Sequence, residues 1–235
     1  MAKSARHQPT AVLQLVNPGA GLAFQDSGRI GWLHQGIPPS GAMDDLGMSM
    51  ANLLVGNPPG QTVLEAALAG LKLKALKDIV LGVAGTDGVF TVGDRKYGGW
   101  RTILCPKGET FQILRLTQGV WTYIAVPSGF DAPAVLGSAS TFACLDLGRP
   151  LRRRDVLNVC EPGADLPPEI AGRFASDTAR RHNHPVVHLR LWPGPQRREV
   201  GARAMTVLLT TEWAVSPRFN RVGYRLNGPR IRLAS

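Results

Sequence analysis

The sequence lacks the features that mark several large classes of protein. No apolar run approaches the ~20 residues that span a membrane, and residues 1–10 are polar and lack the apolar segment of a secretory signal. The three cysteines are far apart and form no Cys-x-x-Cys pair, so neither a disulfide framework nor a zinc site is indicated. P-loop, nucleophile-elbow, His-Glu-x-x-His and Gly-x-Gly-x-x-Gly motifs are absent too. We therefore expect a cytoplasmic protein with no metal site and no membrane contact.

Acidic residues are scarce: 17 Asp and Glu stand against 27 Lys and Arg, which gives a net charge of +10. The excess of arginine lies after Leu151, in residues 152–154, 180–181 and 197–198 and in the C-terminal tail. Two interpretations remain open, a surface for anions or solvated basic loops. The aromatic residues near these arginine clusters do not form an RNA-binding pattern, and no recognition-helix motif is visible. We expect no nucleic-acid partner.

The 27 Gly and 18 Pro favour many short strands joined by tight turns, so the expected fold class is mainly β with a few short helices. Apolar periodicity with capping residues predicts helices at 44–55 and 199–209. Segments rich in β-branched and aromatic residues predict the strands, at 11–16, 22–25, 79–84, 89–92, 111–116, 120–126, 187–192 and 213–215.

A change of composition divides the chain. Residues 161–185 combine four prolines with Arg180, Arg181 and two histidines, which is typical of a linker. We therefore expect a first half at 9–160 and the start of a second half at 186–235. About 50 residues are few for an independent core, so we expect the second half to be truncated or to pack on the first.

A loop system ahead of the first predicted helix carries the strongest functional signal. Residues 25–31 (QDSGRIG) and 36–44 (GIPPSGAMD) place polar side chains among glycines and prolines, which fix backbone turns. Asp26 and Asp44 are the candidate catalytic carboxylates, for proton transfer or for orienting an amide. The structural alternatives are an Asx-turn for Asp26 and a helix cap for Asp44.

Three further side chains of this loop system are candidates for binding substrate or an anion. Gln25 supplies an amide, and Arg29 offers a guanidinium fork for a carboxylate or phosphate. The alternative for Arg29 is an ion pair with Asp26. Ser40 has no histidine beside it, so capping the helix is favoured over acting as a nucleophile.

A second candidate segment lies near the C-terminus, where residues 216–226 alternate arginine with aromatics. This pattern points to anion binding by Asn220, Arg221, Tyr224 and Arg225. An exposed hairpin without a ligand explains the same pattern. His182 and His184 lie two residues apart without an obvious third ligand, and His34 stands alone. We therefore predict no metal site.

These segments together resemble the allophanate hydrolase subunit 2 family, whose members are also called KipA-like proteins or 5-oxoprolinase C subunits. The matching stretches follow the order of the family and cover about residues 13–229. They are 24–31, 36–44, 51–57, 64–65, 123–126, 135–138, 140–141, 193–196 and 220–226.

The resemblance implies a cyclophilin-like β-barrel architecture with a second, incomplete barrel-like half. It also implies two partners, a KipI-like B subunit and a LamB/YcsF-like A subunit. The implied reaction is the ATP-dependent hydrolysis of the C–N amide bond of 5-oxoproline to give glutamate. This chain alone is expected to be inactive. The alternatives are one half of the carboxyltransferase domain of a urea carboxylase, with biotin carried by another domain, or a non-catalytic module that binds a KipI-like protein. The sequence has neither a P-loop nor a biotin-attachment motif, so ATP or biotin would be held elsewhere.

The sequence departs from the family pattern at several places. Ala139 stands where the family usually has arginine in a Gly-Ser-Arg-Ser-Thr motif, which removes one candidate anion-binding group. Residues 128–130 (SGF) replace the usual Gly-Gly-Ile, and the later family blocks do not occur before Ser235. We therefore keep open the expectation that this chain binds without turnover.

Overall fold

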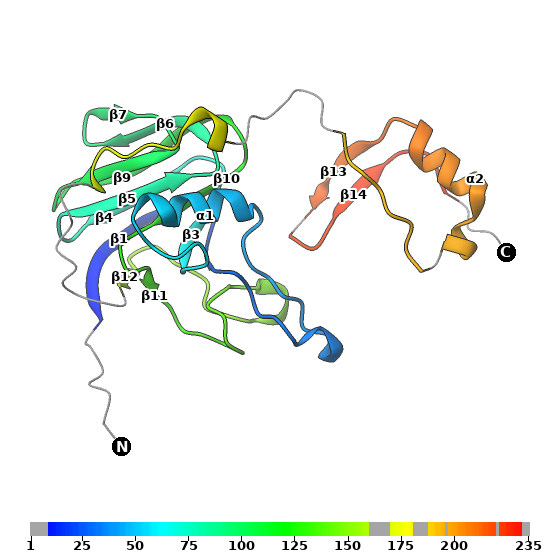
Figure 1. Cartoon of the computed structure of the whole chain (residues 1–235), viewed down its shortest axis with the longest axis horizontal. Coiled ribbons are helices and arrows are strands. Elements are labelled where there is room, and N and C mark those ends of the chain that lie inside the picture. The colour runs from blue at the N-terminus through cyan, green and yellow to red at the C-terminus, as the bar shows by residue number, and fades with distance from the viewer. Residues whose placement is uncertain (1–8, 160–169, 181–187, 196, 220, 232–235) are drawn as a thin grey trace, which may run out of the picture. The chain divides into compact units, whose positions relative to one another are not determined.

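The computed structural model of the protein describes residues 9–159, 170–180, 188–195, 197–219 and 221–231 (Figure 1). The chain forms two compact units, Met1–Asn183 and His184–Ser235. Strands make up most of the regular structure, and two α-helices accompany them in the described residues. The predicted mainly β fold class is confirmed.

The larger sheet of the first unit has seven antiparallel strands in the order β11-β12-β1-β4-β9-β6-β7. Side chains alternate along its central strands, and one face is buried while the other is polar. Its strands are β1 (Thr10–Pro18), β4 (Leu71–Ala75), β6 (Asp87–Val92), β7 (Arg95–Tyr97), β9 (Thr110–Gln118), β11 (Phe130–Asp131) and β12 (Val156–Val159).

The second sheet has five antiparallel strands in the order β2-β3-β10-β5-β8. They are β2 (Gly21–Gln25), β3 (Val63–Ala67), β5 (Ile79–Ala84), β8 (Arg101–Cys105) and β10 (Trp121–Ala125). All six residues of β5 are buried, because both faces of this sheet are covered. In the described residues the two sheets stay separate and do not close into one continuous barrel.

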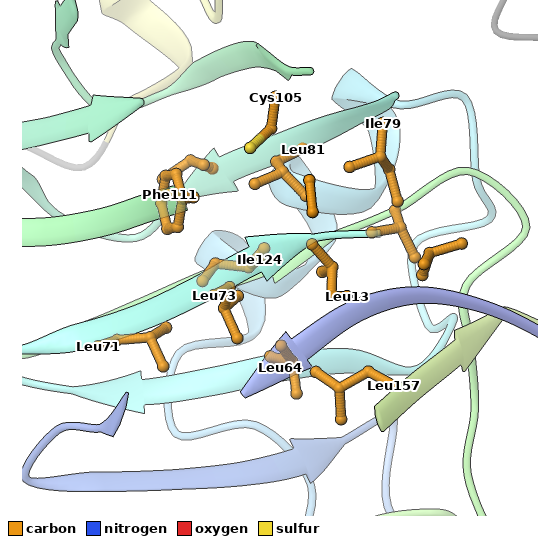
Figure 2. Close-up of a cluster of buried hydrophobic side chains, with 14 of the residues drawn as sticks. Leu13, Leu64, Leu71, Leu73, Ile79, Leu81, Cys105, Phe111, Ile124 and Leu157 are labelled. Carbon is orange, nitrogen blue, oxygen red and sulfur yellow. The ribbon is translucent and has the colours of Figure 1, made fainter. Parts of the chain in front are cut away.

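The main hydrophobic core lies between the two sheets (Figure 2). Leu13 and Leu73 enter it from the seven-stranded sheet, and Leu64, Leu81 and Ile124 enter it from the five-stranded sheet. All five side chains are fully buried. The apolar face of the seven-stranded sheet and one face of the five-stranded sheet therefore meet in one shared interior.

The outer face of the five-stranded sheet carries helix α1 (Asp45–Leu54), which lies against β10 and β5 (Figure 1). Met48, Ala51 and Leu54 of this helix are buried in a second core. A side chain at Gly82 of β5 would place its Cβ 2.3 Å from the main-chain oxygen of Ala51. The absence of a side chain at this position lets the helix backbone approach the strand directly.

Part of the predicted linker belongs to the first unit. Residues 170–180, here called the strap, run along the free edge of β8, where the Thr102 amide donates to the Arg173 carbonyl at 2.9 Å. The Ala175 amide donates to the Trp100 carbonyl at 2.8 Å, and Ile170 and Ala175 are buried in the second core. Residues 161–169 and 181–185, the rest of the segment interpreted as a linker, lie outside the described residues.

The second unit contains α2 (Arg197–Thr210), which is kinked at Gly201, and an antiparallel pair, β13 (Ala214–Phe219) and β14 (Tyr224–Asn227). The predicted second helix is therefore confirmed. The prediction of a half-buried strand at 187–192 is wrong, because residues 188–192 are irregular and Trp192 is 95% exposed. An alternating pattern forms a strand only where a neighbouring strand pairs with it.

Candidate functional site

Asp26 is the centre of a hydrogen-bond network just after β2. Its Oδ1 accepts from the Gly28 amide at 2.8 Å and from the hydroxyls of Ser138 and Ser140, each at 2.6 Å. Its Oδ2 accepts from the Ala139 amide at 2.6 Å. The Gly28 contact is an Asx-turn, and the others join the loop after β2 to residues 138–140.

This network stabilises the charged form of the Asp26 carboxylate. Burial by itself would raise the pKa of Asp26, but hydrogen bonds from Ser138, Ser140, Gly28 and Ala139 outweigh it, and the pKa lies below the ordinary value. A carboxylate with four donors and a lowered pKa is a weak proton acceptor. The geometry therefore favours the loop-holding interpretation of Asp26 over proton transfer.

Arg29 holds the same segment from the other side. Its NH1 donates to Ser40 Oγ at 2.7 Å, its Nε to the Val135 carbonyl at 3.4 Å and its NH2 to the Ser140 carbonyl. The residue is 1% exposed, and its burial lowers the pKa of the guanidinium while the charge of Asp26 acts in the opposite direction. The described residues contain no ion pair between Arg29 and Asp26. The two charges meet indirectly, because both bind Ser140.

Gln25 joins this group through Thr141. Its Nε2 donates to the Thr141 carbonyl at 3.1 Å, and the Thr141 amide donates to the Phe24 carbonyl at 2.9 Å. Gln25 is fully buried, and its Oε1 has no hydrogen-bond partner among the described residues. This enclosed oxygen is an acceptor that no donor in the described part of the chain uses.

Ser40 and Pro39 lie beside Arg29 and close the loop of residues 30–38 at its base, here called the neck. The φ of Ser40, 61°, is in the left-handed region, and its hydroxyl accepts from Arg29 rather than capping α1. The Arg29 amide donates to the Pro39 carbonyl at 2.7 Å and closes the neck on its other side. Ile30 and Leu33, beyond the neck, are 83% and 69% exposed. The capping role predicted for Ser40 is therefore wrong, since the N-cap position of α1 is occupied by Asp44.

Asp44 lies at the N-cap of α1, but its side chain makes no capping hydrogen bond. Its Oδ1 is enclosed and has no hydrogen-bond partner among the described residues. The backbone amide of Asp44 instead donates to the Tyr123 hydroxyl at 2.7 Å. The structure thus leaves one oxygen of this candidate carboxylate without a donor in the described part of the chain.

Glu65 and Tyr123 are part of the site although we did not predict them from the sequence as functional residues. They are paired across β3 and β10, and the Tyr123 hydroxyl donates to Glu65 Oε2 at 2.8 Å. The same oxygen accepts from the Met43 amide at 2.8 Å. Burial and then the charge of Glu65 raise the pKa of Tyr123, so its proton is retained. The signal available in the sequence was only that both residues lie in stretches that resemble the family.

The predicted residues therefore form two adjacent clusters. Gln25, Asp26 and Arg29 converge on residues 135–141, and Ser40 joins them through Arg29, whereas the Asp44 backbone is bound to the Glu65–Tyr123 pair. Residues 41–43 connect the two clusters along the chain. An open apolar groove of about 520 Å³ between α1 and the strap is lined by neither cluster.

The C-terminal candidates lie in the second unit. Arg221 falls between β13 and β14, and Tyr224 and Arg225 begin β14 and are exposed. Phe219 pairs with Tyr224, so the segment forms a hairpin. Asn220 lies outside the described residues, and anion binding by the other three stays a prediction.

Metal ligands do not cluster in the described residues. No group of three or more His, Cys, Asp or Glu side chains in that part of the chain is placed to hold a metal ion. His182 and His184 fall outside it. No helix in the described ranges is long and apolar enough to cross a membrane.

Comparison with known proteins identifies the family. The family model described as "Carboxyltransferase domain, subdomain A and B" matches residues 35–235. The chain belongs to this carboxyltransferase domain family. The family resemblance inferred from the loop motifs is thereby confirmed.

Curated members of the carboxyltransferase domain family differ in length from this chain. It is 29% identical to the C subunit of 5-oxoprolinase from Escherichia coli over 222 residues, which is 92% of this chain and 69% of that protein. It is 27% identical to urea amidolyase of Saccharomyces cerevisiae over 246 residues, which is 98% of this chain and 13% of that protein. The chain therefore spans only a small part of the urea amidolyases that it matches.

Solved structures of the carboxyltransferase domain family share the fold. A crystal structure of TTHA0988 has a TM-score of 0.82 at 32% identity and covers 94% of this chain and 80% of that chain. The urea carboxylase of Kluyveromyces lactis has a TM-score of 0.81 at 27% identity, covering 98% of this chain and 22% of that chain.

Proposed function

We propose that the chain is the C-subunit component of a 5-oxoprolinase. The observation that carries this proposal is its similarity to the C subunit of the Escherichia coli 5-oxoprolinase, of which it covers 69%, whereas it matches a small part of the urea amidolyases. In this proposal a KipI-like B subunit and a LamB/YcsF-like A subunit complete the enzyme. The chain alone is inactive.

Asp44 is the residue of this chain that we assign to the substrate. Its enclosed Oδ1 has no hydrogen-bond partner in the described part of the chain, and an N–H group of a cyclic amide supplies the donor that such an oxygen lacks. Asp44 would then orient the lactam while its C–N bond is cleaved. Asp26 and Arg29 hold the loop that precedes it, and Gln25 offers the second unused acceptor, Oε1.

The loop system ahead of α1 fits ATP poorly. The phosphates of a nucleotide require exposed donors, and Arg29 is 1% exposed with donors engaged by protein oxygens. Ala139 contributes only its amide, which Asp26 already accepts. We therefore assign ATP binding to a partner protein of the complex and derive no step through it.

A second function is favoured by the family model and by the urea carboxylase of Kluyveromyces lactis. In this alternative the chain is one half of a carboxyltransferase domain, and biotin is carried by another domain. Asp44 would orient an N–H group of urea in the same way, since urea and a lactam present the same donor. The enclosed oxygen of Asp44 therefore supports both substrates, and the assembly decides between them.

The test is reconstitution with the three purified proteins. The complete mixture is supplied with 5-oxoproline and ATP, and glutamate release is measured with each protein omitted in turn. We expect release only from the complete mixture, a loss of about 100-fold or more in Asp44→Asn, and near-normal rates in Asp45→Asn. Asp45 is the matched control because it is exposed, adjacent and loses the same charge.

Two other outcomes identify the alternatives. Carboxylation of urea in a parallel assay with a biotin-carrying partner, without glutamate release, would assign the carboxyltransferase function. A stable complex with the KipI-like protein that gives no turnover in either assay would assign the non-catalytic module. Either result overturns the 5-oxoprolinase proposal.

A further inference from the structure

The position of the Asp44 carboxylate is not fixed by its own hydrogen bonds. The side chain leaves the α1 amides uncapped, and Oδ1 has no partner in the described ranges. A Cβ at Gly47 would lie 3.0 Å from Asp44 Oδ2. The carboxylate is therefore seated over the first turn of α1, and another part of the fold must determine where it lies.

The backbone at Asp44 is held from the sheet below. Glu65 Oε2 accepts from the Met43 amide at 2.8 Å, and the Tyr123 hydroxyl accepts from the Asp44 amide at 2.7 Å. Glu65 is 2% exposed and Tyr123 is fully buried. Two consecutive amides of the loop are thus bound by two side chains that are themselves joined at 2.8 Å.

The direction of these hydrogen bonds is determined by their chemistry. An ionised carboxylate only accepts, so the Tyr123 hydroxyl donates to Glu65 and offers its lone pair to the Asp44 amide. The raised pKa of Tyr123 keeps that proton in place. Charge-assisted hydrogen bonds of this kind are shorter and stronger than neutral ones.

The helix is seated on the same tyrosine. A Cβ at Gly47 would lie 2.8 Å from Tyr123 Cδ2 and 2.8 Å from the Gly85 Cα. The ring of Tyr123 therefore supports the first turn of α1 while its hydroxyl holds the residue before the helix. Both contacts act on the backbone that carries the Asp44 side chain.

We propose that Glu65 and Tyr123 are positioning residues that set the Asp44 carboxylate for substrate through the Met43 and Asp44 amides. The inference rests on the proposed function only in that Asp44 is the group that meets the substrate. The pair touches neither substrate nor reacting atoms. The pair acts on the geometry of Asp44. A buried hydrogen-bond network with no role in the reaction would give a different result in the experiments below.

The first experiment needs no partner protein. Amide hydrogen exchange is measured in Tyr123→Phe, with Tyr97→Phe as the matched control because it removes the same hydroxyl from β7 of the other sheet. We expect exchange at Met43 and Asp44 to accelerate about tenfold or more while β3 and β10 keep their protection. Unchanged exchange at these two amides, or equal acceleration throughout the sheet, overturns the proposal.

The second experiment is a double-mutant cycle in the assembled complex. Tyr123→Phe should lower kcat about tenfold with KM within about twofold of the wild type, because geometry at the reacting bond changes more than binding does. In an Asp44→Asn background the same change should cost nothing further. Multiplied losses would mean that Tyr123 acts independently of Asp44 and would overturn the proposal.

Glu65→Gln covers the case in which Tyr123→Phe fails to fold. It keeps the size and an acceptor but removes the charge, so the same two amides should exchange faster, by a smaller factor. Wild-type exchange in this variant counts against the inference. If the wild-type complex is inactive in both the 5-oxoproline and the urea assays, the proposed function fails, and the exchange measurements still decide the positioning role.

Discussion

Replacing Asp26 by asparagine should destabilise the first unit by a measurable amount. The carboxylate accepts three hydrogen bonds on Oδ1 and one on Oδ2, the latter from the Ala139 amide at 2.6 Å. In the variant an NH₂ group must face at least one of these donors. One charge-assisted hydrogen bond is then lost and the remaining ones become neutral, which together cost about 2–4 kcal/mol of unfolding free energy.

The pH dependence gives this prediction a second readout. The folded-state pKa of Asp26 lies below its ordinary value, so its contribution is complete above about pH 4 and is lost as the pH falls through the folded-state pKa. The difference in unfolding free energy between the wild type and Asp26→Asn should therefore be largest near neutral pH. It should shrink below about pH 4, because Asp26 then takes up a proton in the unfolded chain, and it should be smallest once the pH has also fallen below the folded-state pKa, where the folded side chain is neutral too.

Urea denaturation followed by circular dichroism at several pH values measures both effects. Asp131→Asn on β11 is the control, since Asp131 is exposed, and it should change the unfolding free energy by less than about 0.5 kcal/mol. The reasoning is refuted if Asp26→Asn costs no more than this control at pH 7. It is also refuted if the cost is the same at pH 3 and pH 7.

Two further predictions follow from close packing and from burial. Gly82→Ala should lower the unfolding free energy by about 2 kcal/mol or more, because the new Cβ would lie 2.3 Å from a main-chain oxygen of α1. Gly98→Ala is the control, since a Cβ there would have no neighbouring atom within 4 Å among the described residues, and it should be nearly neutral in the same denaturation assay. In a Cys160→Ser background, a thiol reagent at pH 8 should modify exposed Cys144 and leave buried Cys105 unmodified. Burial and then the neighbouring carboxylate of Glu109 raise the pKa of Cys105 to about 11, so its thiol stays protonated at this pH. Equal rates of modification of the two cysteines, measured by mass spectrometry, would contradict this.

Local patterns predicted the elements whose sequence differs clearly from their surroundings. The helix at 44–55 was recognisable because apolar residues recur on one face and Gly56 ends it, and it is observed as Asp45–Leu54. The strand at 79–84 has the same bounds in the structure. In contrast, β3, β4 and β8 were not predicted: each is only five residues long, and its pairing depends on strands elsewhere in the chain.

The long-range interactions of the candidate site were predictable from the sequence on one side only. Asp26 and Arg29 stand out because glycines and prolines surround them. Their partners, Ser138 and Ser140, lie more than 100 residues away along the chain and are ordinary residues in composition. Long-range pairs of this kind are set by sheet order, which spacing within one segment cannot encode.

Residues 138–141, which bind Asp26 and cover the edge of β2, also protect the protein from aggregation. β2 is the outermost strand of its sheet, and an outermost strand with unpaired peptide groups recruits strands from other molecules. The Thr141 amide donates to the Phe24 carbonyl at this edge of the sheet, and the strap hydrogen-bonds to β8 at the opposite edge. A chain in which this stretch has come loose should therefore aggregate, and light scattering would register the damage before any change in strand content.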